Sequence, residues 1–357
     1  MDFNEYLDGM SKIQNSLLEY VENDQETDQN LIQLINEYKI SNNKKELKQF
    51  IHIFMQILNN HHRQHDFYDK VLKILTFIKN DIKKYFANDE IYNLFESNNR
   101  IILFLINEAI LILNEYICKK INHEYFAPEI SVFKHEEKNQ QNLPENFDKM
   151  RKIGENDSYI CQLIRDDLID DFILHVNKNN IQFKTAKIES SIFETNLLLS
   201  KRNTNFIEYA AFFGSVQIFK YLFLNGMKLE SSLWIYVIHG RNPELIHLLE
   251  ENNIKPSDKS FEECVDEAIK CHHNEIANYL QNNYYNNEKN KNKILSKSLK
   301  YYNFELINPD INNEDFLFDL CIYDYFTLVK LILKHTTVDI NTNVVFNIYF
   351  FLNSVLH

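Results

Sequence analysis

Apolar residues recur every three or four positions along most of this chain, which is the spacing that places side chains on one face of an α-helix. In the first third of the chain, this spacing predicts helices over residues 2–23, 45–58, 67–86 and 101–117. The last stretch is the most apolar, and two polar pairs, Asn107–Glu108 and Asn114–Glu115, interrupt it seven residues apart. Residues seven apart share a helix face, so we expect one buried helix with a polar stripe.

This stretch is not expected to insert into a membrane. It is shorter than the roughly 20 apolar residues that cross a bilayer, and a carboxylate within the bilayer is costly. The acidic, polar start of the chain lacks the features of a signal peptide. The five scattered cysteines do not resemble a secreted disulfide framework. We therefore expect a reducing, cytoplasmic setting.

The pattern turns polar between residues 122 and 154, where Pro128 and Pro144 also fall. We therefore predict three segments, namely a helical N-terminal domain over 1–125, a polar linker over 126–155 and a repeat array over 156–357. The N-terminal helices are also candidates for self-association.

The repeat array is predicted from three similar stretches that begin at Phe206, Leu233 and Cys264. Each stretch has a short helix with small and apolar residues, a turn, and a second helix with paired apolar residues. A fourth copy contains residues 328–332, a weaker copy begins at Leu168, and an irregular unit is expected around 291–307. One helix pair cannot bury its own apolar face, so neighbouring pairs must stack in a row. The predicted fold class is all-α, with a helical bundle followed by a helix-pair solenoid.

Residues 203–229 resemble an ankyrin repeat. The matching residues are the alanine pair Ala210 and Ala211, the turn glycine Gly214, the second-helix residues Ile218, Lys220 and Leu222, and the terminal glycine Gly226. The stretch Val338–Asn341 resembles the tail of such a repeat. The sequence departs from the family pattern because its Thr-Pro-Leu-His signature is absent, and because Arg241 and His272 replace the turn glycine in the next two units.

The whole series of units is similar to a large group of divergent ankyrin proteins from parasitic protists, trichomonads in particular. Proteins of that group have a helical N-terminal region followed by ankyrin units. The resemblance implies an ankyrin-type solenoid and a role in binding another protein.

Composition excludes several other functions. Apolar residues make up 45% of the 357 residues, whereas there are only five glycines and five prolines. No glycine-rich phosphate-binding loop, nucleophile elbow or dinucleotide-binding fingerprint occurs. A net charge of −13 disfavours nonspecific attraction to nucleic acid or to anionic membranes. We therefore expect a non-enzymatic scaffold without a cofactor, which binds a partner protein through the concave face of its repeats.

The candidate partner-binding residues lie beside the predicted turns, where the stack itself does not require particular side chains. They are Phe212, Phe213, His239, Lys270 and Tyr323. Aromatic residues at such positions are potential anchors for a partner. For the two phenylalanines, an equally supported interpretation is burial between repeat units.

The alternative hypothesis is a metal-binding or enzymatic module that uses Cys264, Cys271, His272 and His273. The spacing of these residues is not that of a usual structural zinc site. We expect His273 instead to donate to backbone carbonyls of neighbouring turns.

Two further clusters have simpler interpretations. We expect His61, His62 and His65 to be solvated turn residues. The carboxylates at 166, 167, 170 and 171 are expected to stabilise a helix N-terminus.

The segment 344–356, VVFNIYFFLNSVL, contains no charge. Repeat arrays normally end in a polar cap. Either the array is shorter than in related chains, or this segment folds back over the last unit.

Overall fold

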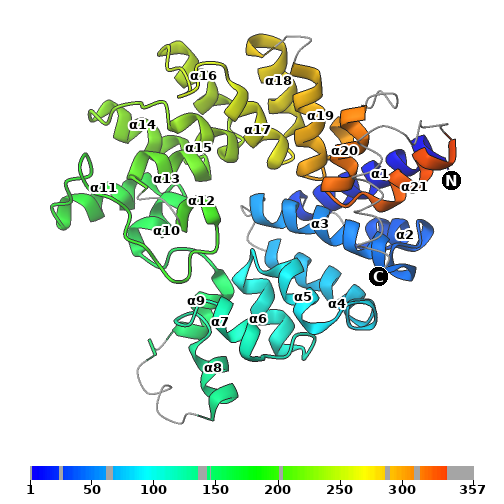
Figure 1. Cartoon of the computed structure of the whole chain (residues 1–357). Helices are drawn as coiled ribbons and strands as arrows, with labels where there is room; N and C mark the ends of the chain where they lie inside the picture. The colour runs from blue at the N-terminus through cyan, green and yellow to red at the C-terminus, as the bar shows by residue number, and fades with distance from the viewer. Residues whose placement is uncertain are drawn as a thin grey trace. The chain divides into compact units, whose positions relative to one another are not determined.

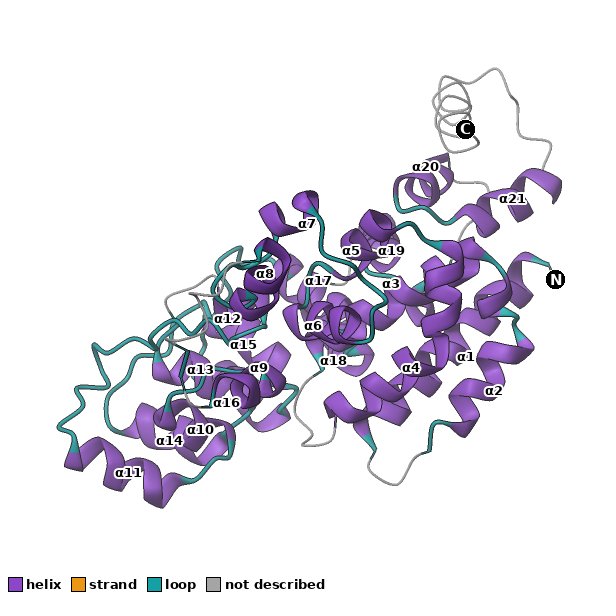
Figure 2. Cartoon of the chain, turned by 90° about the horizontal axis from the view of Figure 1, so that it is seen from below, coloured by secondary structure: helices purple, strands orange, loops and turns teal. Residues whose placement is uncertain are grey.

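The computed structural model describes residues 2–23, 27–61, 67–135, 143–144, 146–200, 204–285, 290–308 and 314–335. Helices and loops make up this part of the chain (Figure 2), and no strand is assigned within it. A single isolated bridge joins Lys187 and Asn205. The predicted all-α class is therefore confirmed for the described residues. Among them, no helix combines the length and the apolar content needed to cross a membrane.

The helices up to residue 153 are α1 (Phe3–Glu22), α2 (Gln29–Glu37), α3 (Lys44–Asn60), α4 (Phe67–Tyr85), α5 (Asn88–Phe95), α6 (Asn99–Asn107), α7 (Glu115–Lys120), α8 (Ala127–Lys134) and α9 (Phe147–Ile153), with the short 3-10 helix η1 (Ile40–Asn42) before α3. Capping side chains mark the starts of α1, α3, α6 and α7. The Asp2 carboxylate accepts the N–H of Glu5, and the Glu5 carboxylate accepts the N–H of Asp2. The Asn43 side chain caps α3 by accepting the N–H of Lys45.

The helix predicted over 101–117 is wrong in one respect, because the structure divides it into α6 and α7. The backbone turns at Ala109, whose φ is +51°, and the N–H of Ile110 donates to the carbonyl of Leu105. The side chain of Asn114 then accepts the N–H of Ile117 and caps α7. Polar residues that were assigned to a stripe therefore end one helix and start the next.

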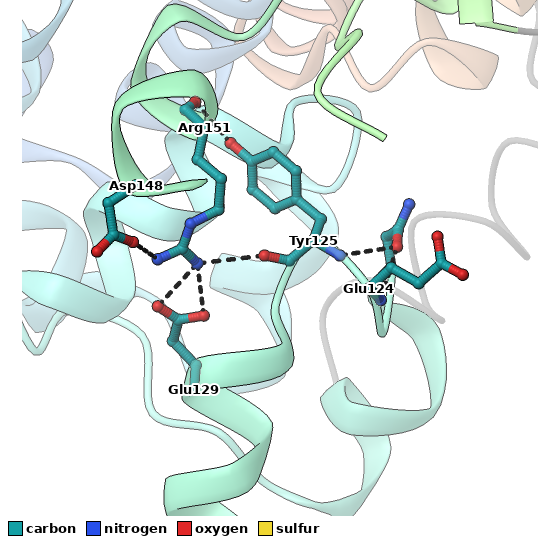
Figure 3. Close-up of polar contacts among 6 residues, drawn as sticks. Glu124, Tyr125, Glu129, Asp148 and Arg151 are labelled. Carbon is teal, nitrogen blue, oxygen red and sulfur yellow. Dashed lines mark hydrogen bonds and ion pairs between the residues drawn. The ribbon is translucent and has the colours of Figure 1, made fainter. Parts of the chain in front are cut away.

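The predicted polar linker contains α8 and α9, which the buried side chain of Arg151 holds together (Figure 3). One of its terminal nitrogens donates to both oxygens of Glu129, at 2.9 and 2.7 Å, and to the carbonyl of Tyr125 at 3.2 Å. The other nitrogen donates to Asp148. In return, the Tyr125 hydroxyl donates to the carbonyl of Arg151 at 2.9 Å. Because a buried guanidinium needs such partners, the ends of this segment are fixed in the fold.

The remaining helices are α10 (Tyr159–Arg165), α11 (Ile169–Lys178), α12 (Leu197–Ser200), α13 (Phe206–Phe213), α14 (Val216–Leu224), α15 (Leu233–Gly240), α16 (Pro243–Glu251), α17 (Glu262–Lys270), α18 (Asn274–Tyr284), α19 (Lys291–Lys300), η4 (Phe304–Leu306), α20 (Glu314–Ile322) and α21 (Phe326–His335). Apart from α12, they form consecutive pairs, each joined by a short turn. The irregular unit expected around 291–307 is present, because its second helix is reduced to the single turn η4. Ala210, Ala211 and Ala268 are fully buried within these pairs.

The chain forms two compact units. Unit 1 contains residues 1–81 and 268–357, and unit 2 contains residues 82–267. These boundaries fall within α4 and α17, and they differ from the three segments predicted from the sequence. In unit 1, α1 and α3, blue in Figure 1, lie beside α21, which is red. Residues far apart in the sequence therefore share one core in unit 1.

Candidate functional site

The helix pairs share one turn geometry. The turn residue of each described pair has a positive φ, at Asp167, Gly214, Arg241, His272, Tyr302 and Asp324. Its N–H donates to the carbonyl three residues earlier, as His272 does to Ile269 and Tyr302 does to Leu299. This geometry ends the first helix and starts the second. Non-glycine residues adopt this conformation at a modest cost, and five of the six turns have a residue other than glycine at this position.

In unit 1, the side chains of the turn residues contact the neighbouring turns. A ring nitrogen of His272 lies 3.3 Å from the carbonyl oxygen of Tyr302, and the Tyr302 hydroxyl donates to the carbonyl of Tyr323 at 3.0 Å. The Tyr325 hydroxyl reaches the carbonyl of Leu299 at 2.8 Å. Such a role was predicted for His273. The structure gives it to His272, because His272 occupies the turn position.

In unit 2, a carboxylate makes the corresponding link. Both oxygens of Asp167 accept backbone N–H groups at the start of α14, from Gln217 at 3.0 Å and Ile218 at 2.9 Å. The Ser215 hydroxyl donates to the carbonyl of Ile164 at 2.5 Å. The predicted role of the aspartate cluster at a helix N-terminus is confirmed for Asp170 and Asp171, which lie in the first turn of α11. Asp167 instead caps α14, in the next pair.

The turns of unit 1, residues 270–273, 301–304 and 323–325, form a surface that we call the turn face. Helix α1 contacts it through Gln14, whose side chain is 0% exposed. The Gln14 amide nitrogen donates to Asn303 at 3.1 Å, and its oxygen accepts the N–H of Phe304 at 2.7 Å. The Asn303 amide in turn donates to the carbonyl of Ile269 at 3.0 Å. One buried amide thus satisfies both a donor and an acceptor of the turn face.

The C-terminal end of α3 makes a second contact with the turn face. Asn60 donates to the carbonyl of Lys270 at 3.4 Å, and a ring nitrogen of His61 lies 2.5 Å from the carbonyl oxygen of Cys271. The other ring nitrogen of His61 lies 2.7 Å from the carboxylate of Glu22. His61 is buried, so the prediction of a solvated residue is wrong for it, and His62 and His65 lie outside the described residues.

Charged and aromatic side chains surround these backbone contacts. Lys48 of α3 pairs with the turn residue Asp324, and the ring of His52 stacks on Tyr302 with centroids 4.7 Å apart. Burial lowers the pKa of His52 and of His272 to about 4. Both rings are therefore neutral at pH 7. The contacts of Gln14, Lys48, His52 and Tyr302 were not predicted, because the local pattern does not reveal which residues hundreds of positions apart will meet.

The predicted partner-binding residues occupy different environments. In unit 2, Phe212 is 0% exposed and stacks on the buried His239, with ring centroids 4.9 Å apart. His239 lies 2.5 Å from the Glu267 carboxylate. Phe213 is half-buried beside Phe212. Phe212 and His239 are therefore core residues. For Phe212, this agrees with the alternative prediction of a buried ring.

Lys270 and Tyr323 are the two predicted residues in unit 1. Both are half-buried, and the backbone carbonyls of both accept hydrogen bonds, from Asn60 and Tyr302 respectively. The structure therefore brings Phe212, Phe213 and His239 together in unit 2 and places Lys270 and Tyr323 on the turn face of unit 1.

The residues of the metal hypothesis are engaged in other ways. Cys264 and Cys271 are both buried, and burial raises the pKa of the Cys264 thiol well above its ordinary value. The thiolate is the form that binds zinc, so burial disfavours it at Cys264. The ring nitrogens of His272 lie 3.3 Å from the carbonyl oxygens of Lys270 and Tyr302, and a ligating nitrogen would have to leave its carbonyl.

Unit 2 contains a buried polar cluster that sequence analysis did not identify. Glu194 accepts the N–H of Asn196 at 2.9 Å and of Asn156 at 3.3 Å, and burial raises its pKa to about 7. Arg165 pairs with Glu155 at 2.8 Å and donates to the hydroxyl of Tyr209 at 2.9 Å. An irregular insertion, residues 182–196, follows α11, and the cluster holds the end of this insertion against the residues that precede α10. Its acidic residues lie in irregular segments, where no periodicity marks them.

We found no protein family model, curated protein or solved structure that matches this chain.

Proposed function

We propose that this chain is a non-enzymatic scaffold of the divergent ankyrin type, with residues 156–335 as a helix-pair solenoid that binds a partner protein. The recurring turn and the buried alanines in the paired helices support the proposal. The net charge of −13 argues against nucleic acid as the partner. Five cysteines without disulfide bonds, all buried, are typical of a reducing, cytoplasmic protein.

One observation carries the proposed binding mode. The turn face of unit 1 already binds helices, because α1 and α3 meet its backbone groups through Gln14, Asn60 and His61. Backbone donors and acceptors recur in every turn of the same geometry. A row of turns can therefore bind a helix through backbone groups, whichever side chains the turn residues carry. We infer that the partner contributes helical segments with amide or imidazole side chains.

The structure refines the set of residues expected to contact a partner. Phe213, Lys270 and Tyr323 are half-buried and retain accessible area. Phe212 and His239 are proposed to act indirectly, because Phe212 packs on Phe213 and His239 packs on Phe212. Self-association through α1 and α3 is less favoured, since their apolar residues Ile13, Leu17 and Phe50 are fully buried.

The proposal is tested by comparing two single substitutions in unit 2 of the full chain. We expect Phe213→Ser to reduce capture of the partner from a cell extract by about tenfold, the loss typical of one anchor residue. The control is Leu224→Ser, which alters a side chain that is 81% exposed and should leave capture unchanged. Equal capture by both variants and the parent chain, with unchanged melting temperatures, would contradict a role for Phe213.

The metal hypothesis remains the alternative, with Cys264, Cys271, His272 and His273 as ligands. Elemental analysis of the purified full chain distinguishes it from the scaffold. Stoichiometric zinc that is lost in a Cys271→Ser variant would favour a metal-binding module.

A further inference from the structure

The last described helix pair leaves an apolar patch in contact with solvent. Phe318 and Ile322 of α20 are 44% and 51% exposed, and Leu333 of α21 is 41% exposed. Phe318 and Ile322 are four residues apart and therefore share one face of α20. Single exposed apolar residues are ordinary, but two on one helix face form a surface that a binding segment can cover.

The neighbouring pair does not cover this face of α20. Asp319 is half-buried and hydrogen-bonds to Ser296 of α19, which shows that α19 lies against the Asp319 side of the helix. Phe318 and Ile322 project from α20 at other angles, about 100° and 60° from Asp319 around the helix axis. The patch is therefore the flank of the array that no described helix pair follows.

The chain itself carries a segment suited to this patch. Residues 344–356, VVFNIYFFLNSVL, contain no charge, and they follow α21 in the sequence. They lie outside the described residues. We propose that residues 344–356 cover the face of α20 that carries Phe318 and Ile322 and so complete the last helix pair. This inference requires no partner protein and is independent of the proposed function.

The length of the connecting chain and the polarity of residues 344–356 both fit this segment as the occupant of the patch. The eight residues 336–343 can extend to about 26 Å, whereas α21, with ten residues, is about 15 Å long. Residues 344–356 carry no charge, so covering the patch would bury no ionised group.

A second copy of the chain is the competing occupant. A segment joined to the patch by a short link has an effective concentration of about a millimolar, which exceeds the concentration of free chains in solution. An uncharged apolar segment that stayed exposed would also promote aggregation. Intramolecular cover is therefore favoured over pairing between copies.

The first experiment places a photoreactive benzophenone side chain at Phe350 of the full chain. We expect cross-links to residues 314–335 of the same chain, with a yield that stays constant over about a hundredfold dilution. Cross-links between copies, with a yield that falls on dilution, would identify a second copy as the occupant and overturn the proposal. Cross-links only to other parts of the chain would also overturn it.

The second experiment measures amide hydrogen exchange in α20. We expect Phe350→Ser combined with Phe351→Ser to speed exchange of residues 314–322 by about tenfold, because local opening becomes easier when the cover is lost. Exchange in α13 should not change, and Leu224→Ser serves as a control for loss of an exposed apolar residue. Unchanged exchange in α20 would contradict the proposal. Because the double variant keeps the full chain, the measurement does not depend on whether a shortened chain folds.

Discussion

The two compact units share the geometry of the helix-pair turn, but they bury opposite kinds of ionisable group. Unit 1 buries the neutral imidazole of His272, whose pKa is lowered to about 4, whereas unit 2 buries the carboxyl group of Glu194, whose pKa is raised to about 7. Burial disfavours the charged form in both cases. The turn geometry is the same in both units, whereas the buried ionisable groups differ. We therefore expect the stabilities of the two units to change with pH in opposite directions.

The direction for each unit follows from proton binding. In the unfolded chain the His272 ring has a pKa near 6.5, whereas in the folded chain it binds a proton only near pH 4. Its contribution to stability is complete above pH 6.5 and is lost as the pH falls. Folded Glu194 retains its proton up to about pH 7, whereas the unfolded group, with an ordinary pKa near 4.5, loses it earlier. Its contribution is complete below pH 4.5 and is lost as the pH rises.

The largest expected effect tests whether the units depend on each other. Gln14→Ala leaves Asn303 and the N–H of Phe304 without their buried partner, and should lower the free energy of unfolding of unit 1 by about 4 kcal/mol. Hydrogen exchange within α1 and η4 measures this loss. The only tryptophan, Trp234, lies in unit 2, and its fluorescence should keep its parent transition. The exposed Gln33→Ala is the matched control, and a simultaneous loss of both signals would mean that the units unfold together.

The second effect concerns the stability of unit 1 at acidic pH. Stability of unit 1 should fall by up to about 3 kcal/mol between pH 6.5 and pH 4 through His272 alone. His272→Gln keeps an amide donor in the turn but cannot titrate, so it should remove this part of the pH dependence. Exchange of residues 291–306, followed across the pH range and corrected for intrinsic rates, measures the change. An unaltered slope in the variant would show that His272 does not control it.

The third effect concerns unit 2. Between pH 4.5 and pH 7, Glu194 should reduce the stability of this unit by about 2 to 3 kcal/mol as the pH rises. Denaturant unfolding followed by Trp234 fluorescence should show the decline, and Glu194→Gln should flatten it. Glu189→Gln, an exposed change in the same insertion, is the control. If both variants keep the parent slope, Glu194 is not the group responsible.

The smallest effect separates the two ways in which neighbouring turns are linked. Asp167→Ala removes two acceptors at the start of α14 and should cost unit 2 about 1 to 2 kcal/mol. Tyr302→Phe removes one hydroxyl contact from the turn face and should cost unit 1 about 1 kcal/mol. Thermal unfolding of each variant, with the unit-specific probes named above, compares them. A larger loss for Tyr302→Phe would reverse our ranking of the two links.

Local pattern in the sequence predicted much of the helical structure. The helix pairs around Gly214, Arg241 and His272 were expected from apolar spacing, and α1, α3 and α4 from the same signal. The break between α6 and α7 was missed, because a polar residue such as Asn114 caps a helix as readily as it lies on an exposed stripe. The ankyrin-type arrangement of the pairs stays a prediction, as do the three predicted segments.

The site was less predictable than the fold. Phe212 and His239 were predicted as partner contacts beside the turns, but both proved to be buried. The roles of Phe213, Lys270 and Tyr323 stay predictions. The contacts of Gln14 depend on a partner 289 residues away, and no spacing rule extends over that distance. The pKa values of His272 and Glu194 likewise come from burial, which only the folded chain defines.

Unit 1 is formed by two distant parts of the chain, residues 1–81 and 268–357, and this has a consequence during protein synthesis. Helices α1 and α3 leave the ribosome well before the residues from 268 onward that shield their apolar sides. At about 5 to 20 residues per second, more than ten seconds separate the two events. Residues 82–267 belong to unit 2 and can fold in that interval, whereas the N-terminal helices must remain soluble without their partners. Nascent chains of this protein should therefore depend on chaperones early in translation and become independent of them once α21 has been made.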